Sequence, residues 1–252
     1  MKIRLYEGDC LEIMPKFPAG KVDMILADLP YGTTACKWDS IISLDKLWLQ
    51  FKRLIKPNGA IVLFGSQPFT SKLAVSNLDW FRYEIIWDKV NKYTNALNSN
   101  KMPMKRHENI LIFYAHLPTF NKQYRDGKPY KTTQTKGHGE HTQHGNTGEK
   151  HTTVNDGRHN PCSIVAITGD NKKELGLHPT QKPVELLEYL IKTYTNEGDL
   201  VFDPTMGSGS TGAACVNTNR NFVGIEKDHT YFVGAKDRIE HTSHQDSLQI
   251  VK

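Results

Sequence analysis

A glycine-rich turn near the carboxyl end of the chain limits the choice of fold more than any other feature of the sequence. Residues 199–203 form a short apolar segment that ends in an acid. A turn with three glycines follows: Gly207, Gly209 and Gly212. Glycine permits positive φ angles and lets the backbone approach a ligand closely. In an open α/β sheet, ligands bind just beyond the carboxyl ends of the strands. The segment therefore predicts a buried strand, a ligand-binding turn and a helix of an α/β fold.

Strand-like and helix-like segments alternate along most of the chain. Apolar runs predict strands at residues 3–6, 22–28, 60–64, 83–87, 109–114, 199–203 and 221–226. Helical spacing of apolar residues, or a proline at the start, predicts helices at residues 44–55, 183–195, 211–217 and 229–240. This alternation is typical of a mostly parallel, doubly wound sheet.

Residues 116–177 have a composition unlike that of the rest of the chain. They are rich in Gly, His, Thr, Asn and Lys and almost free of apolar periodicity, which predicts loops, short strands or partial disorder. An insertion of this length in a compact domain usually has a function or is mobile. We therefore divide the chain into residues 1–115, an insertion at residues 116–177, and residues 178–252.

Positive charge is concentrated in the middle of the chain. Residues 89–182 contain 15 Lys and Arg against 7 Asp and Glu, a balance of +8, whereas the whole chain carries +5. This distribution is expected of a segment that contacts phosphates. The four cysteines are scattered without a CxxC pair, and neither a secretory signal nor a membrane-spanning run is recognised. We therefore expect a cytoplasmic protein.

The glycine turn favours a nucleoside ligand with a free amino group. Glu226 ends the strand after the turn, where it can accept hydrogen bonds from both hydroxyls of a ribose. Asp203 precedes the glycines and suits an ammonium group such as that of the methionine part of S-adenosylmethionine. The glycines also match the GxGxxG pattern of dinucleotide sites. However, Asp203 would lie badly near a pyrophosphate, and only 26 residues follow Glu226. A tight turn without any ligand is the remaining alternative.

A second turn of the ligand-binding type consists of Asp28, Leu29, Pro30 and Tyr31, at the end of a predicted strand. An exocyclic amino group of a base is a poor nucleophile because its lone pair is delocalised into the ring. The Asp28 carboxylate and a backbone carbonyl at Leu29 or Pro30 can accept its two N–H groups and expose that lone pair to an electrophile. Tyr31 can stack on a base that has left the double helix. Alternatively, the tetrapeptide is only a turn capped by Asp28.

The two turns and their order resemble the β class of amino-methylating DNA methyltransferases. In that class a (D/S)PPY motif comes first, a target-recognition region second and the methionine-binding glycine motif last. Residues 28–31, 116–177 and 203–212 follow the same order. Three further segments are similar to strand-end or cofactor-flanking segments of the family: residues 87–89, 106–109 and 178–183.

The first motif departs from the family pattern at one position. Leu29 replaces the usual first proline, which loosens the turn but keeps Asp28, Pro30 and Tyr31. In the family, Asp at the first position goes mostly with adenine and Ser mostly with cytosine. The resemblance therefore implies methylation of adenine N6, with cytosine N4 as the alternative.

The resemblance also implies a fold, a cofactor and a set of site residues. The fold is the methyltransferase fold, a Rossmann-like, mostly parallel seven-stranded sheet with one antiparallel strand and a circularly permuted motif order. The reaction is in-line methyl transfer from S-adenosylmethionine to an everted base of double-stranded DNA, with Asp28, Pro30 and Tyr31 as catalytic residues. The implied cofactor contacts are Asp9, Asp28, Lys182, Phe202, Asp203, Pro204, Gly207, Gly209, Ser210, Thr211 and Glu226. Asp9 is assigned to the adenine amino group of the cofactor and Lys182 to its carboxylate. The alternatives are a core position for Phe202 and a solvated one for Lys182.

The basic run that follows residue 87 supplies most candidate DNA contacts. Amide and guanidinium groups can read base edges, and lysines can bind phosphates. The candidates are Lys89, Lys92, Asn95, Lys101, Lys105, Arg106 and, within the insertion, Arg158. A solvated loop is the alternative. His138, His141 and His144 recur every three residues, but their Gly-rich segment has no nearby cysteine, so we expect solvated or phosphate-contacting histidines and no metal site.

Three other functions must be separated from DNA methylation. A DNA-binding module that has lost catalysis would not need the intact Asp, Pro and Tyr, and calorimetry with S-adenosylmethionine tests it. A nucleotide-dependent oxidoreductase rests on the GxGxxG match alone. Methylation of RNA or of a protein glutamine uses similar turns. The resemblance also implies a bacterial or phage-encoded protein. The family often forms dimers and serves restriction–modification systems, so a homodimer and a cognate restriction enzyme are further partners to test. No membrane contact is expected.

Overall fold

The computed structural model describes residues 1–32, 41–135, 150–169, 181–243 and 248–250. The chain divides into two compact units, one of residues 1–121 with 163–252 and one of residues 122–162. The smaller unit falls inside the predicted insertion and is shorter than it at both ends. Within the described residues, no helix combines the length and the apolar character that crossing a membrane requires.

A nine-stranded sheet of the described residues forms the centre of the larger unit. In sheet order its strands are β10 (Ile164–Ala166), β4 (Phe81–Asp88), β5 (His107–Phe113), β3 (Ile55–Gly65), β2 (Val22–Ala27), β11 (Leu200–Asp203), β12 (Asn221–Glu226), β1 (Ile3–Glu7) and β13 (Leu248–Ile250). β5 is antiparallel to both of its neighbours, β3 and β4, and the other described pairings in this sheet are parallel. The predicted mostly parallel sheet with one antiparallel strand is thus confirmed. It is wider than the predicted seven strands because two three-residue strands, β10 and β13, are added at its edges.

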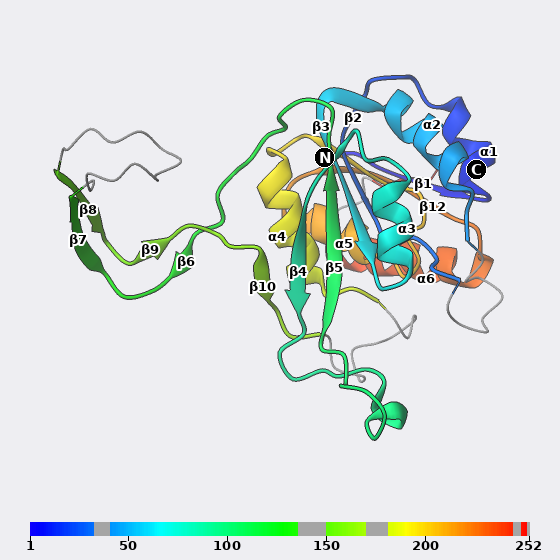
Figure 1. Ribbon diagram of the computed structural model, residues 1–252. Helices are drawn as coiled ribbons and strands as arrows, with labels where there is room; N and C mark the ends of the chain where they lie inside the picture. The colour runs from blue at the N-terminus through cyan, green and yellow to red at the C-terminus, as the bar shows by residue number, and fades with distance from the viewer. Residues whose placement is uncertain (33–40, 136–149, 170–180, 244–247, 251–252) are drawn as a thin grey trace. The chain divides into compact units, whose positions relative to one another are not determined.

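Helices cover both faces of this sheet (Figure 1). One face carries α4 (Val184–Tyr194), α5 (Ser210–Asn217) and α6 (His229–Ser243). The other carries α1 (Cys10–Ile13), the 3₁₀ turn η1 (Met14–Lys16), α2 (Leu44–Leu54) and α3 (Phe69–Val75). The predicted helices at residues 44–55, 183–195, 211–217 and 229–240 correspond to α2, α4, α5 and α6, whereas α1 and α3 lack a periodic signal long enough to predict them.

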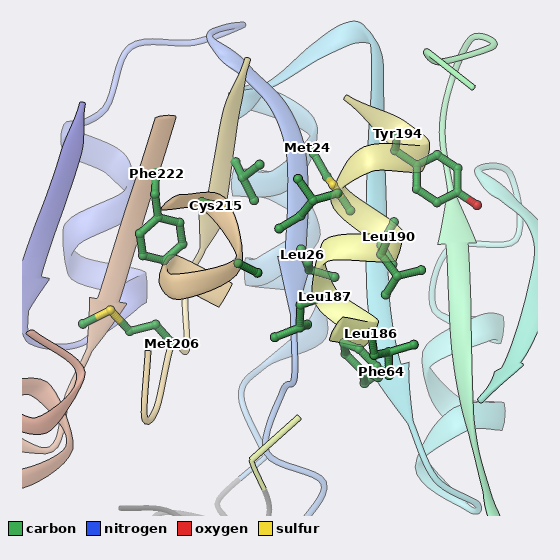
Figure 2. Close-up of a cluster of buried hydrophobic side chains, with 14 of the residues drawn as sticks. Met24, Leu26, Phe64, Leu186, Leu187, Leu190, Tyr194, Met206, Cys215 and Phe222 are labelled. Carbon is green, nitrogen blue, oxygen red and sulfur yellow. The ribbon is translucent and has the colours of Figure 1, made fainter. Parts of the chain in front are cut away.

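Two hydrophobic cores lie between the sheet and these helix layers. Side chains alternate across a strand, and β2 shows the division: Met24 and Leu26 belong to the core beneath α4 and α5, and Ile25 and Ala27 to the core on the opposite face. Figure 2 shows side chains of β2 and α4 together in the first of these cores. The near-continuous apolar run of β2 follows from burial on both faces.

The boundary of β3 differs from the sequence prediction. Pro57-Asn58-Gly59 predicts a turn before a strand that begins at residue 60, but β3 already begins at Ile55. The register explains the signal: Val22 pairs with Ile55 and Met24 with Ala60, so β3 advances five residues while β2 advances two. The turn residues therefore form a bulge inside the strand rather than its start.

The described residues of the smaller unit form two antiparallel strand pairs. β6 (Arg125–Asp126) pairs with β9 (Arg158–His159), and β7 (Tyr130–Thr135) pairs with β8 (Lys150–Asn155). These are the short strands expected of a polar segment without apolar periodicity. His138, His141 and His144 lie outside the described residues.

Candidate active site

The two predicted ligand-binding turns meet in one pocket of about 850 Å³ at the carboxyl ends of β2, β11 and β12. Asp28 and Tyr31 line it from the turn after β2, and Asp203 and Gly207 line it from the turn after β11. The turns are also joined directly, because the Thr205 hydroxyl donates a 3.2 Å hydrogen bond to the backbone carbonyl of Asp28. Parallel strands place their carboxyl ends at one edge of the sheet, and this geometry brings together turns that are far apart in sequence.

Two glycines of the turn after β11 are required by its geometry. Gly207 has φ +52°, and a Cβ placed there would meet no atom within 4 Å, so this position is open. Gly209 has φ +75°, and a Cβ there would lie 2.9–3.0 Å from atoms of Ala235 in α6. Only glycine adopts such a conformation without strain and leaves space for the packed helix.

Asp203 is a buried carboxylate that lines the pocket. Its Oδ1 accepts a 3.0 Å hydrogen bond from the Thr205 amide, and its Oδ2 accepts a 2.7 Å bond from the Thr211 hydroxyl. Burial, together with the nearby negative charges of Asp28 and Glu226, raises the pKa of Asp203 to about 7. A cationic ligand in the pocket would offset that cost and favour the ionised form.

The acid at the end of β12 supports the glycine turn. Glu226 Oε2 accepts a 2.9 Å hydrogen bond from the Gly207 amide, and Oε1 accepts a 2.8 Å bond from the Asp228 amide. Burial raises the pKa of Glu226. At the end of β1, Asp9 accepts from the Leu11 amide at 2.9 Å, and its Oδ2 lies 3.1 Å from Lys227 Nζ. Both carboxylates line the pocket and keep further lone pairs for a ligand.

The Asp28 carboxylate lies at one end of a chain of alternating charges. Its Oδ1 accepts a 2.6 Å hydrogen bond from the Tyr31 hydroxyl, and its Oδ2 lies 2.5 Å from Lys182 Nζ. Lys182 Nζ is also 3.3 Å from Glu108 Oε2, and Glu108 Oε1 is 2.5 Å from Lys89 Nζ. The order along the chain is therefore carboxylate, ammonium, carboxylate, ammonium.

The pKa values of Lys182 and Glu108, the two inner groups of this series, depend on burial and on the neighbouring charges. The Lys182 side chain is only 7% exposed. Burial alone would lower the pKa of Lys182, but Asp28 and Glu108 together raise it above its usual value. Burial alone would likewise raise the pKa of Glu108, but Lys182 and Lys89 lower it. Lys182 thus stays charged beside Asp28, and Glu108 stays charged behind Lys182.

Tyr31 is held on two sides. Its hydroxyl donates to Asp28, and its ring stacks on Phe69 of α3 with centroids 5.0 Å apart and an interplanar angle of 27°. The aromatic ring therefore lies at the pocket wall in a defined orientation.

Most of the predicted cofactor contacts line the pocket, and two do not. Those at the wall are Asp9, Asp28, Lys182, Asp203, Pro204, Gly207, Ser210, Thr211 and Glu226, together with the predicted catalytic residues Pro30 and Tyr31. Phe202 is buried in the core, edge-to-face with Phe17 at 5.7 Å, and Gly209 lies against α6. Lys182 is not solvated, and its ammonium group is directed at Asp28. Residues 178–180 lie outside the described residues.

The candidate DNA contacts occupy different environments. Lys89 and Lys105 line the pocket, and Lys105 donates a 2.6 Å hydrogen bond to Ser66. Arg106 pairs with Asp88 at 2.6 Å. Lys92, Asn95 and Lys101 lie between β4 and β5. In the smaller unit, the Arg158 guanidinium lies 4.5 Å from the Tyr124 ring centre.

Glu108 is a site residue that the sequence did not identify as functional. It lies in β5 next to the pocket and binds both Lys182 and Lys89. The available signal was an acid near the start of an apolar strand, within the segment at residues 106–109 that resembles the methyltransferase family. An acid at a strand end facing other charged groups is a candidate for a pocket position.

The sequence is similar to those of known DNA methylases. The sequence matches the family model of N6/N4 DNA methylases over residues 22–237. It is 29% identical to the type II methyltransferase M.HpaI of Haemophilus parainfluenzae, over 95% of this chain and 75% of that protein. It is 26% identical to the type II methyltransferase M2.DpnII of Streptococcus pneumoniae, over 95% and 90%.

Solved structures show the same fold. The crystal structure of the M1.HpyAVI–SAM complex is similar with a TM-score of 0.65 and 28% identity, over 94% of this chain and 98% of that one. The cytosine-N4-specific PvuII DNA methyltransferase is similar with a TM-score of 0.64 and 16% identity, over 99% and 95%.

Proposed function

Because the chain belongs to the N6/N4 DNA methylase family, we propose that this DNA methyltransferase modifies the N6 amino group of adenine in double-stranded DNA. The observation that carries the proposal is the single pocket lined by Asp28 on one side and by Asp203 and Gly207 on the other. The Asp28 carboxylate suits the amino group of a base, and the Asp203 carboxylate suits the ammonium group of a cofactor. A base and a cofactor bound side by side in this pocket could contact both carboxylates.

The residues of the glycine turn fit S-adenosylmethionine, the cofactor of the related M1.HpyAVI–SAM complex. This cofactor supplies an electrophilic methyl group on a sulfonium. Asp203 would bind its ammonium group, since a buried carboxylate with a raised pKa is stabilised by a cation. Glu226 would accept from the ribose hydroxyls, and Asp9 would accept from the adenine amino group. The open position at Gly207 leaves room for the ligand against the backbone.

Asp28 is suited to accept one N–H of the target amine. Both of its carboxylate oxygens already have a partner, Tyr31 at Oδ1 and Lys182 at Oδ2. A carboxylate has about four lone-pair sites, so each oxygen can accept a further hydrogen bond. The backbone carbonyl of Asp28 is engaged by Thr205, which leaves the carbonyl at Leu29 or Pro30 for the second N–H.

Positive charge develops on the amine nitrogen as the methyl group is transferred. A preorganised carboxylate next to that nitrogen stabilises the charge in a pocket of low dielectric. Lys182 and Glu108 are positioning residues in this proposal: Lys182 fixes one oxygen of Asp28, and Glu108 fixes Lys182 from the far side. The extra proton leaves the nitrogen after the transfer, and no covalent enzyme intermediate is needed.

Adenine is favoured over cytosine by the first residue of the motif. The family association of Asp with adenine and Ser with cytosine supports adenine, and this chain has Asp28. Cytosine N4 remains the second candidate, because the same acceptors serve either amine. We further propose that the unit of residues 122–162, with Arg158, takes part in target recognition.

Sequencing of modified bases in DNA from cells that express the protein tests the proposal. Cells should carry no other adenine or cytosine methyltransferase, and a matched culture should express Asp28→Ala. We expect N6-methyladenine at one short recurring sequence with the wild-type protein and none with the variant. N4-methylcytosine in place of N6-methyladenine would support the second candidate, cytosine. Unmodified DNA from cells that contain folded wild-type protein would refute both candidates.

A further inference from the structure

The connection between β4 and β5, residues 89–106, is a basic segment with an apolar tip. It carries five cationic side chains and no carboxylate. Its exposed apolar side chains include Tyr93, Leu97, Met102 and Met104. Leu97 is the extreme case: it lies in the 3₁₀ turn η2 (Ala96–Asn98) and is 102% exposed, as free as in an extended peptide.

This segment is folded, which makes the exposure of Leu97 informative. Thr94 and Lys105 form an antiparallel bridge, with backbone hydrogen bonds of 2.8 and 3.1 Å. At the tip, the amides of Asn98 and Met102 donate to the carbonyls of Asn95 and Asn98 at 3.1 and 3.0 Å. Asn95 has φ +68°, and its side chain accepts from Asn98 at 2.7 Å. The backbone therefore presents Leu97 on a defined turn.

The two ends of the segment that are joined by the bridge border the active site. Thr94 and Lys105, which close the bridge, line the same pocket as Asp28. Residues 95–104 extend from that rim, and Figure 1 shows the short helical turn beyond the ends of β4 and β5. Because DNA must approach the pocket to deliver a base, a segment on its rim meets the duplex next to the target.

Charge and hydrophobicity together identify the occupant of this surface. Lys89 and Arg106, at the two ends of the segment, pair with Glu108 and Asp88. The lysines between them lie in a stretch that contains no carboxylate, which complements the phosphates of a duplex. A fully exposed leucine at the tip matches the wedges that DNA-distorting proteins insert between base steps, for which leucine is one of the residues used. A second protein copy would be expected to cover a broader and less charged apolar face.

We propose that residues 94–105 bind the duplex beside the target and that Leu97 enters the base stack, where it fills the space left by the everted base. This inference rests on the proposed base eversion and holds for adenine or cytosine. Leu97 would act before methyl transfer, by lowering the free-energy cost of keeping the base out of the helix. That cost is smallest for a mispaired base.

The test compares Leu97→Ala with a matched control on two substrates. The substrates are oligonucleotide duplexes carrying the sequence found to be modified in cells, one with the target base paired and one with an abasic site opposite it. The control is Leu49→Ala, which removes another exposed leucine, on α2. The readouts are single-turnover methyl transfer at saturating cofactor and, in parallel, the sedimentation of each protein.

We expect Leu97→Ala to slow transfer to the paired duplex about tenfold, equivalent to about 1.4 kcal/mol, and to regain the wild-type rate on the abasic duplex. Leu97→Met should keep most of the rate, and Leu49→Ala all of it. An equal loss on both duplexes, or no loss on either, would overturn the inference. A loss accompanied by dissociation of a wild-type dimer would do so as well, by assigning the tip to contact between copies. Failure of the wild-type protein to methylate any DNA would instead refute the proposed function.

Discussion

Replacing Lys182 by Met removes the ammonium group that connects Asp28 to Glu108 while keeping the length of the side chain. Removing one partner of a buried ion pair typically costs about 3–5 kcal/mol, because the other charge loses its compensation. Here Glu108 retains Lys89 at 2.5 Å, and the Asp28 side chain is 31% exposed. We therefore expect the lower end of that range, a fall of about 3 kcal/mol in the free energy of unfolding.

The loss in the free energy of unfolding that Lys182→Met causes should depend on pH. The lowered pKa of Glu108 stabilises the folded state above its usual value of 4.5, and this contribution is lost as pH falls through the lower folded value. The raised pKa of Lys182 stabilises the fold below its usual value of 10.5, and this contribution is lost at higher pH. The difference between variant and wild type should therefore be largest between about pH 5 and 10 and shrink on either side.

Catalysis should suffer as well, because Asp28 loses the group that fixes its Oδ2. A charge-assisted hydrogen bond contributes about 1.5–3 kcal/mol, so kcat should fall by roughly 10- to 100-fold with a smaller change in KM for DNA. The control is Lys192→Met, which removes an exposed lysine paired with Glu188 at 3.2 Å in α4. Surface pairs of this kind are worth at most about 1 kcal/mol. Urea denaturation and steady-state methylation by Lys182→Met that match this control would refute the reasoning.

Three further predictions concern the cofactor side of the pocket. Asp203→Asn should abolish S-adenosylmethionine binding in calorimetry, and retained binding would contradict the assignment. The same variant should raise the free energy of unfolding of the cofactor-free protein at pH 8 by up to about 4 kcal/mol, because a buried carboxylate with a pKa of about 7 is costly when ionised. The affinity of the wild-type protein for the cofactor should rise from pH 6 to 8 as Asp203 loses its proton, and pH-independent binding would argue against it. Gly209→Ala should lower stability by about 2–4 kcal/mol from positive φ and the clash with Ala235, whereas Gly20→Ala, at φ +63° with nothing within 4 Å, should show only the smaller cost of φ.

Local patterns were sufficient to predict most of the sheet and both turns of the site. Strand periodicity and helical spacing depend on neighbouring residues, so β2, β11, β12 and the helices after them could be placed from sequence. Asp28 and Asp203 follow apolar strands directly, and the carboxyl ends of parallel strands share one edge. Their meeting in one pocket follows from that rule.

Contacts that depend on side-chain direction and long-range register could not be predicted in the same way. Lys182 meets Asp28 and Glu108 only after β5 has joined the sheet and α4 has packed on it, and no spacing in the sequence encodes that contact. Phe202 precedes Asp203 in β11, and adjacent strand residues point to opposite faces. Once Asp203 lines the pocket, Phe202 therefore lies in the core.

We propose that Asp28 binds the target amine in the same pocket in which the glycine turn binds the methyl donor. The most direct measurement uses purified protein, S-adenosylmethionine with a labelled methyl group, and unmethylated DNA, followed by digestion and separation of the nucleosides. We expect label in N6-methyl-2′-deoxyadenosine for the wild-type protein and none for Asp28→Ala, although that variant should still fold and bind the cofactor in calorimetry. Undiminished label in the Asp28→Ala reaction would contradict the role proposed for Asp28. Label absent from every base with the wild-type protein would contradict DNA methylation itself.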